Sequence, residues 1–289
     1  MRAYELAHAK ENKNPKLFSN GVSAQDLSQG GLGDCWLISA IAALAEFPGL
    51  IQRVFLTKET SEWGRYQVRL FDISKPSAGG HKVKGHFVSV TIDDRLPCEV
   101  DGGYPSTMYL KMNNEGEIWP LLLEKAMAKW AGSYEDLDGG HAAWALATLT
   151  GWETVSYNKF DNDTVWTKCK LTPHPDHPRS PHKVEFKSMH EEPEDSGKLF
   201  ELLKDFEKKE FVMCASSGHG TDSVEDSQGG IVQGHAYVER ERGQRREEKR
   251  REGTNFYLSF SKSPPPYNKP VPMHACPSLY FLTFFCCSS

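Results

Sequence analysis

The sequence predicts an α/β (α+β) fold whose first half is helical and whose second half is rich in strands. Apolar residues recur at helical spacing over residues 117–131 and 141–150, which predicts two helices. Apolar and polar residues alternate over 64–72 and 85–92, which predicts two strands. A chain that mixes helices and strands in this way is typical of the α/β classes.

In chain order, the first expected helix covers residues 36–44 and follows a glycine-rich turn. Residues 74–84, which contain a Gly-Gly pair, form the expected loop between the first two strands. Pro120 lies in the first turn of the next expected helix, where proline is tolerated, and Gly151 ends the helix after it.

The second half contains a stretch, residues 170–194, that is rich in proline, histidine and charge. We expect a surface insertion or a link between subdomains there. An amphipathic helix is expected over 197–209. Strands are expected over 211–215, 231–238 and 256–260, which makes this half the β-rich one.

The composition is that of a globular chain. Its 289 residues, 38% hydrophobic and 25% charged, suffice for one large or two moderate domains. A net charge of −5 gives no electrostatic reason to expect nucleic acid as a partner. No stretch reaches the ~18 apolar residues of a transmembrane helix. The seven cysteines lack metal-ligand spacing, and no signal sequence precedes them, so we expect a reduced, cytoplasmic compartment.

The most informative segment, Gln29-Gly-Gly-Leu-Gly-Asp-Cys35, places a cysteine at the start of a predicted helix. The positive end of a helix dipole favours thiolate, the nucleophilic form of cysteine. Gln29 provides an amide donor that suits a developing oxyanion. The alternative is a buried, structural cysteine in a glycine-rich turn.

A second informative segment, residues 229–237, surrounds His235 with small residues on a predicted strand. A cysteine nucleophile needs a base that is distant in sequence and close in space. A lone histidine on a strand is more often structural than catalytic. Together with the segment around Cys35, however, it favours a Cys-His catalytic pair.

These residues resemble the calpain family, the papain-like cysteine endopeptidases regulated by calcium. The similarity covers roughly residues 18–238. Its motifs stand in order at Gln29–Leu37, Val90–Pro97, Leu123–Ala126, Gly132–Glu135 and Gly234–Tyr237. A chance coincidence of these motifs in the right order is very improbable, so the resemblance is specific.

The resemblance implies a papain-like core whose helical first subdomain carries Cys35 and whose incomplete β-rich second subdomain carries His235. It implies peptide-bond hydrolysis of intracellular proteins, with Gln29 at the oxyanion and no organic cofactor. The expected division is an N-terminal lead (1–17), a first subdomain (18–160), a second subdomain (161–262) and a divergent tail (263–289).

The chain departs from the family after the histidine. The family completes its triad with an asparagine in an Asn-Pro-Trp-Gly motif, and no such motif follows His235. Asn255 and Asn268 are the nearest substitutes, and neither matches the pattern. Because the third residue orients the histidine, we expect a protease of weak activity.

The resemblance also implies a calcium site in the first subdomain. The matching positions are Asp26 and Glu124, with backbone carbonyls near Ser19 and Gly21. Carboxylates and carbonyls are the oxygen ligands that Ca²⁺ prefers. From the sequence alone, Glu124 is an ordinary surface residue of a helix. The family's second calcium site falls after the missing motif, so we expect it to be absent.

The tail Leu279–Cys287 is nearly all apolar or aromatic and does not resemble the family. Its paired cysteines permit lipidation and membrane association. The alternatives are a buried edge strand and a terminus altered by splicing or gene prediction, and we favour the altered terminus because the departure begins where the family motif should stand. The partners that the resemblance implies are protein substrates. Two rival functions stay open: a catalytically silent calpain-like binding module, and another Cys-His acyl-transfer enzyme such as a transglutaminase.

Overall fold

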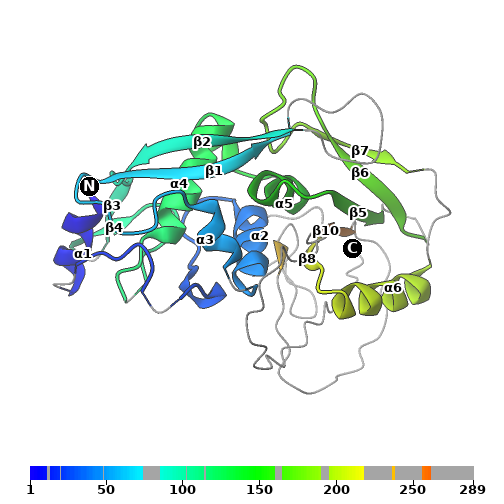
Figure 1. The fold of residues 1–289 in the computed structure, drawn as a ribbon, viewed down its shortest axis with the longest axis horizontal. Coiled ribbons are helices and arrows are strands. Elements are labelled where there is room, and N and C mark those ends of the chain that lie inside the picture. Colours follow the sequence, from blue (N-terminus) through cyan, green and yellow to red (C-terminus); the bar gives the residue numbers. More distant parts are fainter. Residues whose placement is uncertain are drawn as a thin grey trace. The chain divides into compact units, whose positions relative to one another are not determined.

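The computed structural model describes residues 1–11, 14–19, 21–47, 49–73, 85–101, 103–113, 115–159, 165–189, 195–217, 236–237 and 256–261. The chain forms two compact units (Figure 1). The first unit comprises Met1–Gly151 and Thr172–Glu185, and the second comprises Trp152–Leu171 and Phe186–Ser289. This division differs from the expected boundary at residue 160. Both units contain helices and strands, so the mixed α/β class is confirmed.

The first unit is built on three helices: α2 (Cys35–Ala45), α4 (Trp119–Ala131) and α5 (Ala142–Thr150). All three are apolar around most of their circumference, and most of their residues are buried. Alanines on α2 and α5 allow the two helices to pack closely, and Trp36 meets Trp144 edge to face at 5.9 Å between ring centroids. The core of this unit therefore surrounds the first turn of α2.

Two antiparallel hairpins complete this unit. Strands β1 (Arg65–Asp72) and β2 (His86–Asp93) pair from Arg65–Asp93 to Asp72–His86 and run as a long hairpin along α4 and α5 (Figure 1). The second hairpin joins β3 (Cys98–Asp101) to β4 (Tyr104–Thr107). Short helix α3 (Leu50–Val54) and the 3-10 turns η1 (Ala24–Asp26) and η2 (Glu135–Leu137) connect these elements. The expected loop 74–84 lies outside the described residues.

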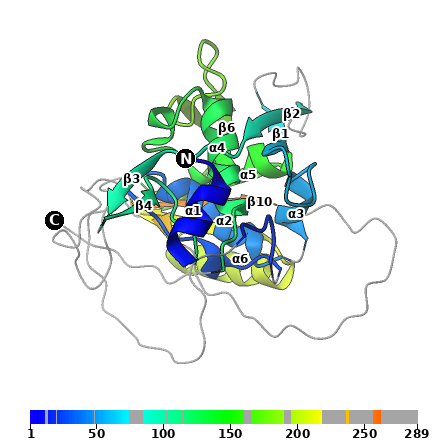
Figure 2. The ribbon, with the colours of Figure 1, turned by 90° about the vertical axis from the view of Figure 1, so that its left-hand side faces the viewer.

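The N-terminal segment, expected as a polar lead, is packed into the first unit. Helix α1 (Ala3–Glu11) buries Ala3 and Leu6 and lies beside the β3–β4 hairpin (Figure 2). The Arg2 guanidinium pairs with Asp94 at 3.0 Å, and the Ala3 N–H donates to the Asp94 carbonyl. Small apolar residues at helical spacing explain this packing, because they bury one side of a short helix.

The remaining strands form a six-stranded sheet in the order β7-β6-β5-β10-β8-β9. Its members are β5 (Thr154–Lys159), β6 (Thr167–Pro173), β7 (Val184–Ser188), β8 (Val212–Ser217), β9 (Ala236–Tyr237) and β10 (Phe256–Ser261). Helix α6 (Ser196–Lys208) contributes Leu199 and Leu203 to a core with Tyr157 and Trp166. The expected insertion at 170–194 thus contains parts of two sheet strands, which pairing stabilises despite their prolines and charges. No helix among the described residues is long and apolar enough to cross a membrane.

Candidate active site

Cys35 is the first residue of α2, and its side chain is buried, with 8% of the residue exposed. The preceding residue, Asp34, is the N-cap, and its carbonyl accepts from the N–H groups of Leu37 at 2.8 Å and Ile38 at 3.0 Å. The predicted position of Cys35 at a helix N-terminus is therefore confirmed. The helix dipole there favours negative charge on the sulfur.

The glycine-rich turn before Cys35 is clamped between two other segments of the first unit. A Cβ atom added at Gly30 would clash with the Tyr109 carbonyl, and one at Gly33 would clash with the Asp138 carboxylate. The Gly33 carbonyl accepts from the Gly139 N–H at 2.7 Å. None of the glycines in this turn has a positive φ. Glycine is required here because other chain segments approach closely, rather than for a sharp bend.

Gln29 is half-buried, and its side-chain amide donates to the Leu32 carbonyl at 2.9 Å. This hydrogen bond folds the side chain back over its own loop. An amide nitrogen carries two hydrogens, so one donor suffices for Leu32 and the other suits a second acceptor. The oxyanion role of Gln29 stays a prediction.

His235 lies outside the described residues, as do Asn255 and Asn268. The two residues after His235, Ala236 and Tyr237, form β9 and pair with Ser216 and Ala215 of β8. Strand β10 begins at Phe256, directly after Asn255, and lies between β5 and β8. The roles of the histidine and of either asparagine stay predictions. The apolar tail also lies outside the described residues.

The expected calcium ligand Asp26 lies next to Glu117 rather than Glu124. The Asp26 carboxylate accepts from the Ser23 N–H at 2.8 Å and from the Trp119 indole at 3.3 Å. Glu117 accepts from the Ser19 N–H at 2.6 Å and from the Asn113 amide at 2.9 Å. The same Asn113 amide reaches Asp26 at 3.5 Å.

The two carboxylates of this first pair repel each other. Burial raises the pKa of Glu117, and the neighbouring charge of Asp26 raises it further. Ser19, expected as a carbonyl ligand, reaches the pair through its N–H, and Gly21 lies exposed in the same loop with a φ of 105°. Among the described residues, no three His, Cys, Asp or Glu side chains cluster as a metal site. A cation at this pair therefore needs carbonyl oxygens from the loop as well.

Glu124 is not a surface residue, and the structure corrects that expectation. Only 2% of it is exposed, because nearly all residues of α4 are buried. Its carboxyl group accepts from the Leu110 N–H at 3.0 Å and neighbours the Asp34 carboxyl group, whose Oδ2 atom is buried without a hydrogen-bond donor. Glu117 lies before the start of α4 and contacts Ser19 and Asn113, whereas Glu124 lies within α4 and contacts Leu110, so the two glutamates belong to separate sites.

Sequence reasoning missed Glu117, Asn113 and the role of Asp34. No spacing rule joins Asp26 to Glu117 or Asp34 to Glu124, because about ninety residues separate the members of each pair. The one available signal was the position of Glu117, an acid directly before an apolar helix. A carboxylate there is favoured by the helix dipole, which made a ligand role for it hard to recognise.

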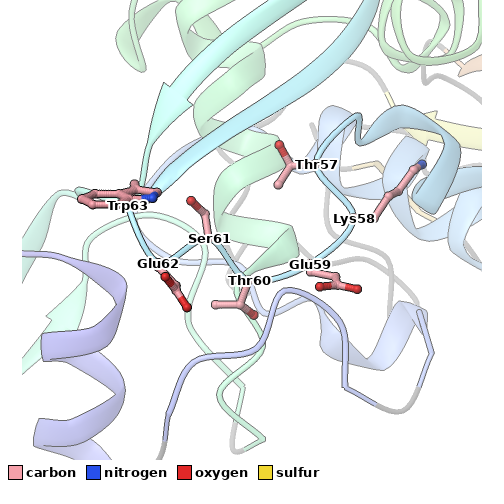
Figure 3. A pocket seen from close by; sticks show the side chains of 7 residues that line it. All are labelled: Thr57, Lys58, Glu59, Thr60, Ser61, Glu62 and Trp63. Carbon is pink, nitrogen blue, oxygen red and sulfur yellow. The ribbon is translucent and has the colours of Figure 1, made fainter.

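One pocket, of about 440 Å³, lies away from these residues (Figure 3). A single loop between α3 and β1, Thr57–Trp63, lines it. The Thr60 hydroxyl accepts from the Leu17 N–H at 2.8 Å, and the Ser61 N–H donates to the Tyr66 hydroxyl at 3.0 Å. These polar groups serve the packing of the loop. The pocket contains no cysteine or histidine, so it is no candidate for the predicted chemistry.

Comparison with known proteins identifies a single family. The sequence model of the calpain family cysteine proteases matches residues 1–252. The calpain-type cysteine protease ADL1 of Oryza sativa subsp. japonica is 34% identical over 238 residues, which cover 82% of this chain and 9% of the rice protein. The calpain-type cysteine protease DEK1 of Arabidopsis thaliana is 36% identical over 79% of this chain and 9% of its own length. Calpain-5 of Caenorhabditis elegans is 32% identical over 78% of this chain and 30% of its own length.

Proposed function

Because the chain belongs to the calpain family of cysteine proteases, we propose that it is a cysteine endopeptidase with Cys35 as its nucleophile. The family membership confirms the resemblance found in the sequence, and a calpain core implies the papain-like fold. The chain spans less than a third of these relatives, so the activity and substrates of the whole proteins are proposed here for this core alone. The observation that carries the proposal is Cys35 itself, placed at the start of a buried helix behind a clamped turn.

The proposed reaction is acyl transfer. His235 takes the proton of the Cys35 thiol, and the sulfur attacks the carbonyl carbon of the scissile peptide bond. Gln29 and the Cys35 N–H stabilise the oxyanion of the tetrahedral intermediate. His235 then protonates the leaving amine, and water hydrolyses the thioester. The motif set supports these roles, with Cys35 in the first subdomain and His235 in the second.

Calcium is the proposed regulator of the loop that leads to the nucleophile. Asp26 and Glu117 would hold the ion together with carbonyl oxygens near Ser19 and Gly21. The fit is supported by two neighbouring carboxylates that share the amide of Asn113 and whose proximity raises the pKa of Glu117 beyond the effect of burial. Bound Ca²⁺ supplies positive charge that removes their repulsion. The proposed substrates are proteins, and the proposed location of the reaction is the cytoplasm.

Alkylation of the full chain with iodoacetamide, with and without calcium, tests the function. We expect calcium-dependent labelling of Cys35 above the other cysteines, located by peptide mapping, and calcium-dependent cleavage of a casein substrate. Cys35→Ala abolishes both signals. Cys98→Ala is the matched control, since Cys98 is also a free cysteine of the first unit, and it retains them.

Labelling without preference for Cys35, together with no cleavage, contradicts the proposal and supports the silent binding module. Incorporation of an amine into a glutamine peptide, without hydrolysis, supports the transglutaminase alternative instead. Cleavage that persists in Cys35→Ala would move the nucleophile to another residue.

A further inference from the structure

A second pair of carboxyl groups connects the turn before Cys35 to helix α4. Asp34, the residue before the cysteine, is 1% exposed, and Glu124 of α4 is 2% exposed. The two carboxyl groups are neighbours, and the Oδ2 atom of Asp34 is buried without a hydrogen-bond donor. Two ionised carboxylates are acceptors only, so a hydrogen bond between these groups requires a proton on one of them. A proton on the pair gives the buried Asp34 oxygen the donor that it otherwise lacks.

The surroundings decide which group carries the proton. Among the described residues, the charge of Asp138 acts on Asp34, and burial and the charges of the pair and of Asp93 raise the pKa of the neighbouring Tyr134, which stacks on Tyr109. None of these groups is a cation. Burial and the charge of Asp34 raise the pKa of Glu124 to about 9, and burial raises that of Asp34 to about 7. At neutral pH the proton therefore resides on Glu124, which donates to Asp34.

Glu124 also contacts the other side of the turn. Its carboxyl oxygen accepts from the Leu110 N–H at 3.0 Å. The segment around Leu110 is in turn bonded to the chain before the cysteine, because the Gly31 N–H donates to the Met108 carbonyl at 3.1 Å and the Lys111 N–H to the Ser28 carbonyl at 2.8 Å. The Glu124 side chain thus contacts both the turn before Cys35 and the segment around Leu110 that is hydrogen-bonded to that turn.

We propose that protonated Glu124 is a positioning residue for Cys35, bridging the Asp34 side chain and the Leu110 N–H so that the turn keeps the nucleophile at the start of α2. This role rests on the proposed function, in which Cys35 attacks the substrate. The shared proton has a second effect. It limits the negative charge beside Cys35 to one carboxylate, and a second charge there would oppose formation of the thiolate.

The conservative variant Glu124→Gln separates this bridge from mere packing. Glutamine donates to Asp34 and accepts from Leu110 without a titratable proton. In the wild type, the raised pKa of Glu124 stabilises the folded chain fully below about pH 4.5, and this contribution is lost as pH rises to about 9. We expect the melting temperature of Glu124→Gln, relative to wild type, to rise by ~5 °C between pH 6 and pH 9.

The matched control is Glu201→Gln, which changes an exposed glutamate of α6 that pairs with Lys204. Its melting temperature is expected to differ from wild type by a constant amount across the same pH range. Parallel pH curves for wild type and Glu124→Gln would overturn the shared proton.

The second readout is the rate of Cys35 alkylation at pH 7 in the full chain. We expect Glu124→Gln to keep the wild-type rate within about twofold and Glu124→Ala to lose about tenfold, because alanine leaves Asp34 and Leu110 without their partner. Equal losses in both variants would overturn the positioning role. If Cys35→Ala keeps its protease activity, the proposed function fails, whereas the pH curves still decide whether the bridge exists.

Discussion

The first unit contains two carboxylate pairs of the same composition, and their surroundings give them different partners. Asp26 and Glu117 lie at a loop, where backbone N–H groups, an indole and an asparagine amide satisfy them. Asp34 and Glu124 are enclosed by helices and receive one backbone N–H at Glu124. The first pair is the open one because Asp26 is only half-buried, although Glu117 is as buried as Glu124, and it suits a cation with carbonyl ligands close by. In the enclosed pair both carboxyl groups are buried, and the proposed proton relieves their repulsion.

The comparison of the two pairs shows that burial decides whether a metal cation or a proton neutralises a pair of carboxylates. A cation brought to the enclosed pair would lose its hydration and find few oxygen ligands in return. A proton requires no space and removes a charge altogether. Both pairs nevertheless act on the same chain segment, since Asp26 precedes the glycine-rich turn and Asp34 ends it. The turn before Cys35 is therefore flanked by one carboxylate pair on each side.

The largest expected effect concerns stability. Glu124→Ala should lower the free energy of unfolding by about 3 kcal/mol, because it leaves a cavity, an unpaired Leu110 N–H and an isolated Asp34 in the core. Glu117→Ala should cost about 2 kcal/mol without calcium, because it leaves the Ser19 N–H without its acceptor but also removes repulsion from Asp26. Urea denaturation at pH 7 measures both values. Equal losses would erase the distinction between the two pairs.

Calcium affinity is the next effect in size. Asp26→Ala and Glu117→Ala each remove a charged oxygen ligand and should weaken binding at least about tenfold, or ~1.4 kcal/mol. Glu124→Gln leaves the affinity unchanged and serves as the control. Isothermal titration calorimetry with CaCl₂ measures all three. A loss in Glu124→Gln without a loss in Glu117→Ala would return Glu124 to the calcium site.

The smallest expected effect belongs to Asn113, the amide that bridges the open pair. Asn113→Ala should cost about 1 kcal/mol of stability without calcium, since both carboxylates lose a donor. Saturating calcium should reduce that loss, because the ion replaces the donor. Thermal melts of wild type and Asn113→Ala with and without calcium measure whether the ion reduces this loss of stability. A loss that calcium does not change would show that Asn113 supports only the loop.

Regular elements with strong periodicity were predicted well from the sequence. The described helices and strands that were expected begin and end within two residues of their predicted bounds, except β9, of which only Ala236–Tyr237 of the expected 231–238 is described. Local patterns suffice there because an apolar helix face or an alternating strand carries its own signal. The strands within residues 170–194 were not predicted, because the alternation that marks a strand is weak in that segment. Prolines and charges there hide the end of β6 and the whole of β7, which pairing with neighbouring strands stabilises.

The candidate site divides in the same way. Cys35 was placed correctly because a glycine-rich turn and a helix start are local features. The sequence by itself also determined the family, since its motifs stand in order along the chain. Which acid faces which was decided by tertiary structure alone. The tertiary structure brings Glu124 of α4 next to Asp34 and Glu117 next to Asp26. Proximity and burial select the partners of these carboxylates, and spacing along the chain does not.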